Sequence, residues 1–142
     1  MRILKSSFVR SAAYAILAFA LSTALIPSQA SASTMLECQS LIDALRADTA
    51  VVAISGKNAE KNRTGLLDKL DGATTSLAKG KLCDAIRKLT DFRDKVNQLI
   101  ASGSINSDPA LGATGQDLVD GATEAIACIQ AQVTESGITC PL

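Results

Sequence analysis

Four cysteines carry the clearest chemistry in this chain of 142 residues. No two of them form a C-x-x-C pair and the sequence contains no His, so their spacing argues against redox-active, zinc-ribbon and c-type haem sites. An even number of widely spaced cysteines is typical of structural disulfides when a protein is exported. We therefore predict two disulfides, with three possible connectivities, among Cys38, Cys83, Cys128 and Cys140.

Acidic side chains give the nearest approach to a catalytic cluster. Asp68 and Asp71 could be grouped with Glu60 or Asp84, but general acid and base chemistry needs a pocket that shifts a pKa, and the sequence marks no such pocket. These carboxylates are interleaved with basic residues along predicted surface helices, a pattern typical of solvated ion pairs; the basic residues are Lys61, Lys69 and Lys81. Because the chain also lacks His, the commonest general base, we predict no catalytic residues and no enzymatic activity.

Two short polar motifs suggest a metal site or a modification site but have simpler explanations. The loop around Asp108 could offer oxygen ligands to calcium, yet it lacks the spaced carboxylates of a calcium loop, so we expect Asp108 to form a turn or cap before Pro109. The tripeptide Asn62-Arg63-Thr64 matches a glycosylation acceptor, and we interpret Asn62 or Thr64 as a helix cap instead. No glycine-rich nucleotide loop occurs. The sequence therefore predicts no metal site and no cofactor.

The first part of the chain has the three regions of a secretory signal. Basic residues without any acidic residue come first, an apolar run over residues 12–26 follows, and Pro27 then leads into a stretch of small residues. We predict cleavage after Ala32, with a cut after Ala30 as the alternative. Residues 1–32 are thus a predicted signal peptide and residues 33–142 a single domain that is secreted or periplasmic and, after cleavage, not attached to a membrane.

The charge and aromatic content of that domain argue against several classes of binding partner. Removing Arg2, Lys5 and Arg10 leaves 11 basic and 14 acidic residues, a net charge of −3. This charge offers no electrostatic footprint for nucleic acid or for an anionic membrane surface. Phe92 is the one aromatic residue left, so no stacking platform for sugars or bases is expected.

Apolar residues recur at helical spacing in four stretches. We predict helices over about 35–54, 59–79, 81–101 and 114–133, with Gly56, Gly80, Gly103 and Gly137 as stops. The third stretch is the most regular, with inward residues Leu82, Ala85, Ile86, Leu89, Phe92, Val96 and Leu99. In the first we expect Leu36, Leu41, Leu45 and Val52 to face inward. The turn-rich segment 102–115 precedes the last helix.

Short connections between amphipathic helices predict an all-α fold, an antiparallel up-down-up-down four-helix bundle. That topology places all four cysteines at one end of the bundle and the loop 102–115 at the other, which has no disulfide. We favour the pairs Cys83–Cys128 and Cys38–Cys140, because a cysteine inside the third helix should meet one inside the fourth while the tail folds back to the first helix.

Part of the chain resembles a known domain family. The segments 57–73, 77–81 and 85–97, which read KNAEKNRTGLLDKLDGA, LAKGK and AIRKLTDFRDKVN, resemble the FIMAH domain of secreted bacterial proteins over roughly residues 41–129. The resemblance implies a helical appendage with no catalysis to carry over. This chain departs from the usual setting of that domain because it stands alone behind its predicted signal and has four cysteines.

These observations favour a binding or structural role. We predict an exported, non-enzymatic module of the bacterial envelope or secreted fraction that contacts an unidentified protein or envelope component, with Val51, Ile105 and Leu111 as candidate contact residues. The alternative is a small disulfide-bonded helical inhibitor of an extracellular enzyme, since rigidity lowers the ordering cost of binding.

Overall fold

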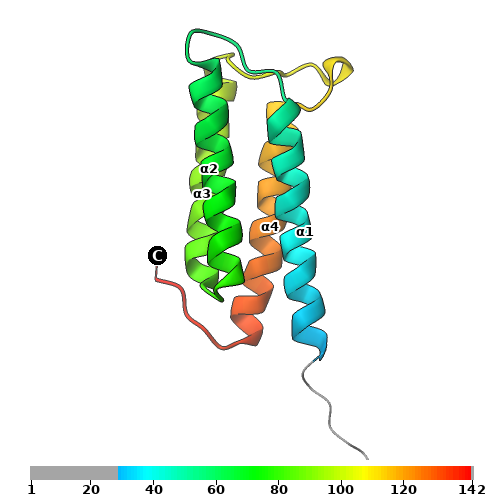
Figure 1. Ribbon diagram of the computed structural model, residues 1–142, viewed down its shortest axis with the longest axis vertical. Coiled ribbons are helices and arrows are strands. Elements are labelled where there is room, and N and C mark those ends of the chain that lie inside the picture. Colours follow the sequence, from blue (N-terminus) through cyan, green and yellow to red (C-terminus); the bar gives the residue numbers. More distant parts are fainter. Residues whose placement is uncertain (1–28, 142) are drawn as a thin grey trace, which may run out of the picture.

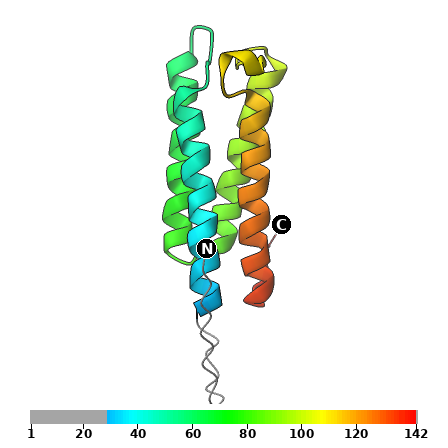
Figure 2. The ribbon, with the colours of Figure 1, turned by 90° about the vertical axis from the view of Figure 1, so that its right-hand side faces the viewer.

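The computed structural model describes residues 29–141 and has four α-helices, α1 (Gln29–Val51), α2 (Ala59–Ala78), α3 (Leu82–Ala101) and α4 (Gly115–Glu135), with a short 3-10 helix η1 (Pro109–Leu111) before α4. The helices alternate in direction, and each packs against two neighbours, so that α4 returns beside α1 (Figure 1). Figure 2 shows α1 between α2 and α4. The predicted all-α antiparallel bundle is therefore confirmed.

The predicted signal peptide stays a prediction. Its residues up to 28 lie outside the described part of the chain, and α1 begins at Gln29, ahead of the predicted cut after Ala32. Within the described residues, no helix combines the length and the apolar character needed to cross a bilayer.

Helices α2 and α3 bury the residues that the sequence pattern indicates. The buried residues of α2 are Leu66, Leu70, Ala73 and Leu77, and α2 ends at a turn in which Gly80 adopts φ +68. In α3, buried residues recur every three or four positions, with Phe92 fully enclosed. Ile86 is the exception, because it is only half-buried and lies on the flank of the helix.

The predicted face of α1 was partly wrong. Leu36 is 71% exposed and Leu41 is only half-buried, whereas Leu45 and, just after the helix, Val52 are buried as predicted. The other buried positions of α1 are Cys38, Ile42 and Thr49. Cys38 and Thr49 occupy core positions that a search for large apolar residues passes over. Thr49 is accommodated because its hydroxyl donates to the Leu45 carbonyl at 2.7 Å, which satisfies the buried polar group.

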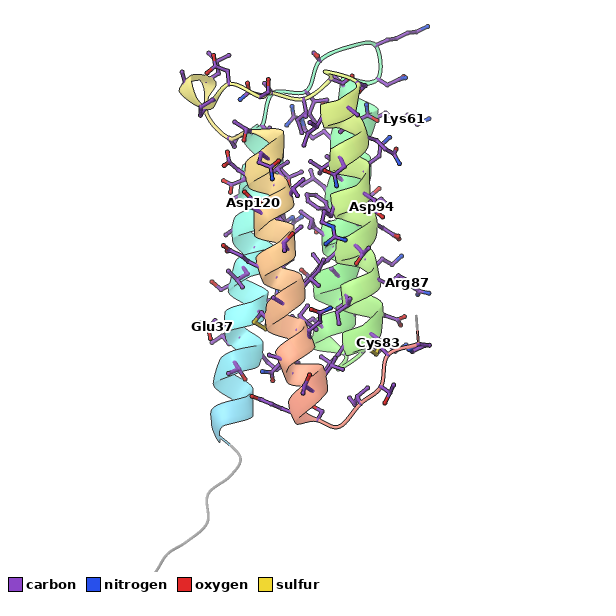
Figure 3. All side chains as sticks on the ribbon, turned by 180° about the vertical axis from the view of Figure 1, so that it is seen from behind. Glu37, Lys61, Cys83, Arg87, Asp94 and Asp120 are labelled. Carbon is purple, nitrogen blue, oxygen red and sulfur yellow. A yellow bond between two sulfur atoms is a disulfide. The ribbon has the colours of Figure 1, made fainter. Side chains whose placement is uncertain are left out.

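All four cysteines form disulfides, but the favoured pairing was wrong. The bonds are Cys38–Cys128 and Cys83–Cys140, with Cα separations of 5.6 and 5.3 Å. Figure 3 places Cys83 and Glu37, the neighbour of Cys38, in the half of the bundle away from the long loop, as the topology predicts. The error arose because α4 packs against α1 as well as α3, so a cysteine on α4 can meet either helix.

The register between α1 and α4 explains the observed pair. A Cβ added at Gly121 of α4 would lie 3.2 Å from Leu45 Cδ1 of α1, so these two residues face each other closely. Cys128 follows Gly121 by seven residues and Cys38 precedes Leu45 by seven, about two helical turns in each case. Antiparallel packing keeps such positions opposite one another. Cys128 therefore faces Cys38 across the α1–α4 contact.

The opposite end of the bundle has no disulfide but is joined by backbone hydrogen bonds. Ile54 and Ile105 form an isolated antiparallel bridge, Ser55 N–H donates to the Ser104 carbonyl at 2.8 Å, and Asn106 N–H donates to the Ala53 carbonyl at 2.8 Å. The Asn106 side chain donates to the carbonyls of Asp108 and Ala113 and accepts from the Asp108 N–H. These hydrogen bonds hold the α1–α2 connection and the α3–α4 connection together.

A single arginine caps the end of α1. Arg63 donates to the carbonyls of Thr49 and Ala50 at 3.1 and 2.8 Å, and these carbonyls lie in the last turn of that helix. The predicted capping role of Asn62 or Thr64 was wrong, because both lie inside α2, whose N-cap is Asn58. In the tripeptide Asn62-Arg63-Thr64, it is Arg63 that serves as a cap, at the end of α1.

The start of α4 leaves no room for a side chain at Gly115. A Cβ there would lie 2.7 Å from both Ile100 Cγ1 and Ile105 Cγ2. We expect Gly115→Ala to lower the free energy of unfolding by about 1–3 kcal/mol, measured by urea denaturation, because an overpacked site forces its neighbours to shift.

The matched control is Gly65→Ala, within α2. Nothing lies within 4 Å of the added Cβ, so the higher helix propensity of Ala should raise the stability by about 0.5–1 kcal/mol. Equal stability of Gly115→Ala and the wild type would contradict this description of the α4 start.

Candidate functional site

A groove with a volume of about 720 Å³ lies between α3, α4 and the C-terminal tail. Residues three or four positions apart line its two helical walls, so each helix contributes one flank. The lining residues are Cys83, Asp84, Ile86, Arg87 and Thr90 from α3, Gln130, Val133 and Thr134 from α4, and Cys140 and Pro141 from the tail.

The chain folds back to form the tail wall. After α4, Gly137 adopts φ +65 and Ile138 N–H donates to the Val133 carbonyl at 3.1 Å, which reverses the chain direction. Cys140 then reaches Cys83, and their disulfide closes the groove at the start of α3. A smaller hollow of about 240 Å³ lies at the same end of the bundle, lined by Met35, Gly80, Leu82, Gln132, Ser136 and Ile138.

The groove combines apolar surface with polar side chains and has no net charge. Ile86, Val133 and the disulfide supply apolar surface. Asp84 and Arg87 are its charged residues, and they form an ion pair with each other at 2.9 Å. The hydroxyls of Thr90 and Thr134 donate to carbonyls of their own helices. Such a surface suits apolar contact bordered by polar groups rather than proton transfer.

The three contact residues expected from the sequence differ in exposure. Val51 and Leu111 are 75% and 74% exposed, and both lie towards the end of the bundle that carries the long loop. Ile105 was wrongly assigned to the surface: it is only 6% exposed, because its bridge to Ile54 carries it into the core. None of the three lines the groove.

Three of the four acidic residues, Glu60, Asp71 and Asp84, form surface ion pairs, but with arginines instead of the expected lysines. Asp71 pairs with Arg46 at 3.1 Å, and Glu60 lies 3.9 Å from Arg63. Asp108 is confirmed as a cap, since its carboxylate accepts from Ala110 N–H at the start of η1. No group of three or more potential metal-ligating side chains occurs in the part of the chain that the structure describes.

The groove was not predicted from the sequence. Ile86 was assigned to the core because it fits the three-four spacing of α3. However, Ile86 also lies three residues after Cys83 and four before Thr90, which places all three on one flank of that helix. A disulfide that draws the tail to this flank was the missing information.

The carboxylate of Asp117 has a structural role at the start of α4. It accepts from the Thr114 backbone N–H and hydroxyl, each at 2.8 Å, while Asp117 N–H donates to the Thr114 hydroxyl at 3.2 Å. The backbone hydrogen bond, followed by the hydroxyl, lowers the pKa of Asp117 below its ordinary value of 3.8. This capping box fixes the first turn of the helix.

The lowered pKa predicts a pH-dependent contribution to stability. Folding favours the ionised carboxylate, so the contribution is complete above 3.8 and disappears as the pH falls through the lower folded-state value. We expect Asp117→Asn to be less stable than the wild type at neutral pH, with the difference shrinking in this acidic window, when urea unfolding is followed against pH.

Thr114→Ser is the matched control, because Ser keeps both the N–H and the hydroxyl that bond the carboxylate. It should retain the wild-type pH dependence. A difference between Asp117→Asn and the wild type that stays constant as the pH falls below 3.8 would argue against the capping box as its origin.

Comparison with protein-family models, with curated proteins and with solved structures finds no match to this chain. The resemblance to the FIMAH domain therefore stays a prediction. The function must be argued from the geometry of the groove and the chemistry of the residues that line it.

Proposed function

We propose that this chain is an exported, non-enzymatic binding module, and that it contacts a protein or envelope component through the groove between α3 and α4. The observation that carries the proposal is the groove itself. Two helices and the tail contribute apolar surface to it, and the disulfide Cys83–Cys140 holds the tail in place. Concave apolar surface with a few polar groups at its border is typical of binding sites.

The charges at the groove favour an apolar segment of the partner. Asp84 and Arg87 neutralise each other at 2.9 Å, so the lining carries no net charge. Polar but uncharged side chains, Thr90, Gln130 and Thr134, border the apolar surface. We expect the partner to insert aliphatic or aromatic side chains, with hydrogen bonding confined to the border.

Rigid support strengthens the proposal. Eight of the ten lining residues lie on α3 and α4, which pack directly against each other, and the other two belong to the tail. A surface that is already ordered loses little conformational entropy on binding. The same property would suit an inhibitor of an extracellular enzyme, so the identity of the captured partner separates these two roles.

The disulfides support the part of the proposal that concerns export. The pairing of all four cysteines is typical of secreted and periplasmic proteins.

The proposal is tested by capture with a variant that fills the groove. Thr134→Arg adds a long charged side chain at an exposed lining position, so a protein retained by the oxidised wild-type chain from extracellular and envelope fractions should be lost. Retention is measured by quantitative mass spectrometry.

Thr123→Arg is the matched control. Thr123 is also exposed on α4, its hydroxyl also donates to the carbonyl four residues earlier, and it lies outside the groove. It should capture the partner as the wild type does. Equal capture of the partner by Thr134→Arg and Thr123→Arg would overturn the assignment of the groove. If the captured partner is an enzyme and the wild-type chain inhibits it, the role is inhibition.

A further inference from the structure

The two disulfides have different surroundings. Cys38 is completely buried and Cys128 is partly exposed, and their bond joins two packed helices, α1 and α4. Cys83 and Cys140 are both partly exposed and line the groove, which is open to solvent. A dissolved thiol therefore has access to both cysteines of Cys83–Cys140 through the groove, whereas in the other bond only Cys128 is partly exposed and neither cysteine lines a hollow.

The segments that carry the cysteines also differ in how firmly they are held. Cys38 and Cys128 would stay opposite each other after reduction, because the packing of α1 against α4 fixes both. Cys140 lies beyond Ile138, whose N–H makes the last backbone hydrogen bond among the described residues of the tail. In the described structure, the disulfide to Cys83 is the bond that ties residues 139–141 to the bundle.

This difference determines how easily each bond is reduced. The stability of a disulfide rises with the effective concentration of its two thiols in the reduced fold. Two thiols on packed helices keep a high effective concentration, whereas a thiol on a released tail explores a larger volume. Cys83–Cys140 should therefore be the more reducible of the two bonds.

We propose that Cys83–Cys140 is a separately reducible latch that controls the groove between α3 and α4. The part of this inference that concerns binding rests on the proposed function. In the step, a thiolate of a dithiol reductant attacks one sulfur of the bond, and the other leaves as a thiolate and takes up a proton. The second thiol of the reductant, as a thiolate, then attacks the reductant sulfur of this mixed disulfide, and the remaining protein sulfur leaves as a thiolate and takes up a proton. Two electrons pass to the protein, which gains two thiols, and the reductant becomes a disulfide.

Opening the latch changes the groove without dismantling the bundle. Cys140 and Pro141 form its tail wall, and both depart when the tail is released. The helical walls remain, since α3 and α4 pack against each other and Cys38–Cys128 still joins α1 to α4. The reduced form therefore keeps a folded bundle with a wider, less ordered groove.

The first test needs no partner. The oxidised chain is titrated with dithiothreitol, free thiols are trapped by alkylation, and each cysteine is assigned by peptide mass spectrometry while helicity is followed by circular dichroism. Half-reduction of Cys83–Cys140 should require about tenfold less reductant than that of Cys38–Cys128, with helicity unchanged across the first step. Reduction of both bonds together, reduction of Cys38–Cys128 first, or loss of helicity in the first step would overturn the latch.

The second test concerns binding by the double variant Cys83→Ser/Cys140→Ser, with Cys38→Ala/Cys128→Ala as the comparison. The first variant should keep its helicity and bind the captured partner about tenfold more weakly, because the tail wall is no longer ordered. Unchanged affinity would overturn control of the groove while leaving the proposed function standing. If no partner is captured, the proposed function fails and the reduction order still decides the latch.

Discussion

Cys38 and Cys128 join the first helix of the bundle to the last, across a sequence separation of 90 residues. This link joins α1 and α4 in the same register that brings Gly121 close to Leu45. By the chain-entropy argument, closing a loop of this size stabilises the fold by about 4–5 kcal/mol. That is a large share of the roughly 5–15 kcal/mol typical of domains, and the core it supports contains one aromatic residue, Phe92.

The two ends of the bundle are closed by different means. At the end with the long loop, backbone hydrogen bonds around Asn106 tie the two connections together, and Gly115 fits because it has no side chain. At the other end, the tail is held by Cys83–Cys140 and forms one wall of the groove. The candidate site therefore lies where a covalent bond holds the tail against the bundle.

Periodicity predicted α2 and α3 closely, because their inward positions carry Leu, Ala, Phe and Val. It failed in α1, where Cys38 and Thr49 occupy core positions, and at Ile105, where a bridge between two loops carries an apparent surface residue inward. Periodicity could not predict contacts between distant parts of the chain. The pairing of Cys128, for example, depends on which neighbouring helix its flank of α4 faces. The groove depends in turn on that pairing, so Ile86 and Val133 could be predicted as apolar helix residues but not as its lining.

Peptide mapping of the oxidised chain under non-reducing conditions tests the central claim most directly, because the closure of α1 on α4 and the tail wall of the groove both depend on the disulfide pairing. The account predicts two linked peptide pairs, one containing Cys38 and Cys128 and the other Cys83 and Cys140. Recovery of Cys83 linked to Cys128, or of Cys38 linked to Cys140, would contradict both the register of α4 and the existence of the groove.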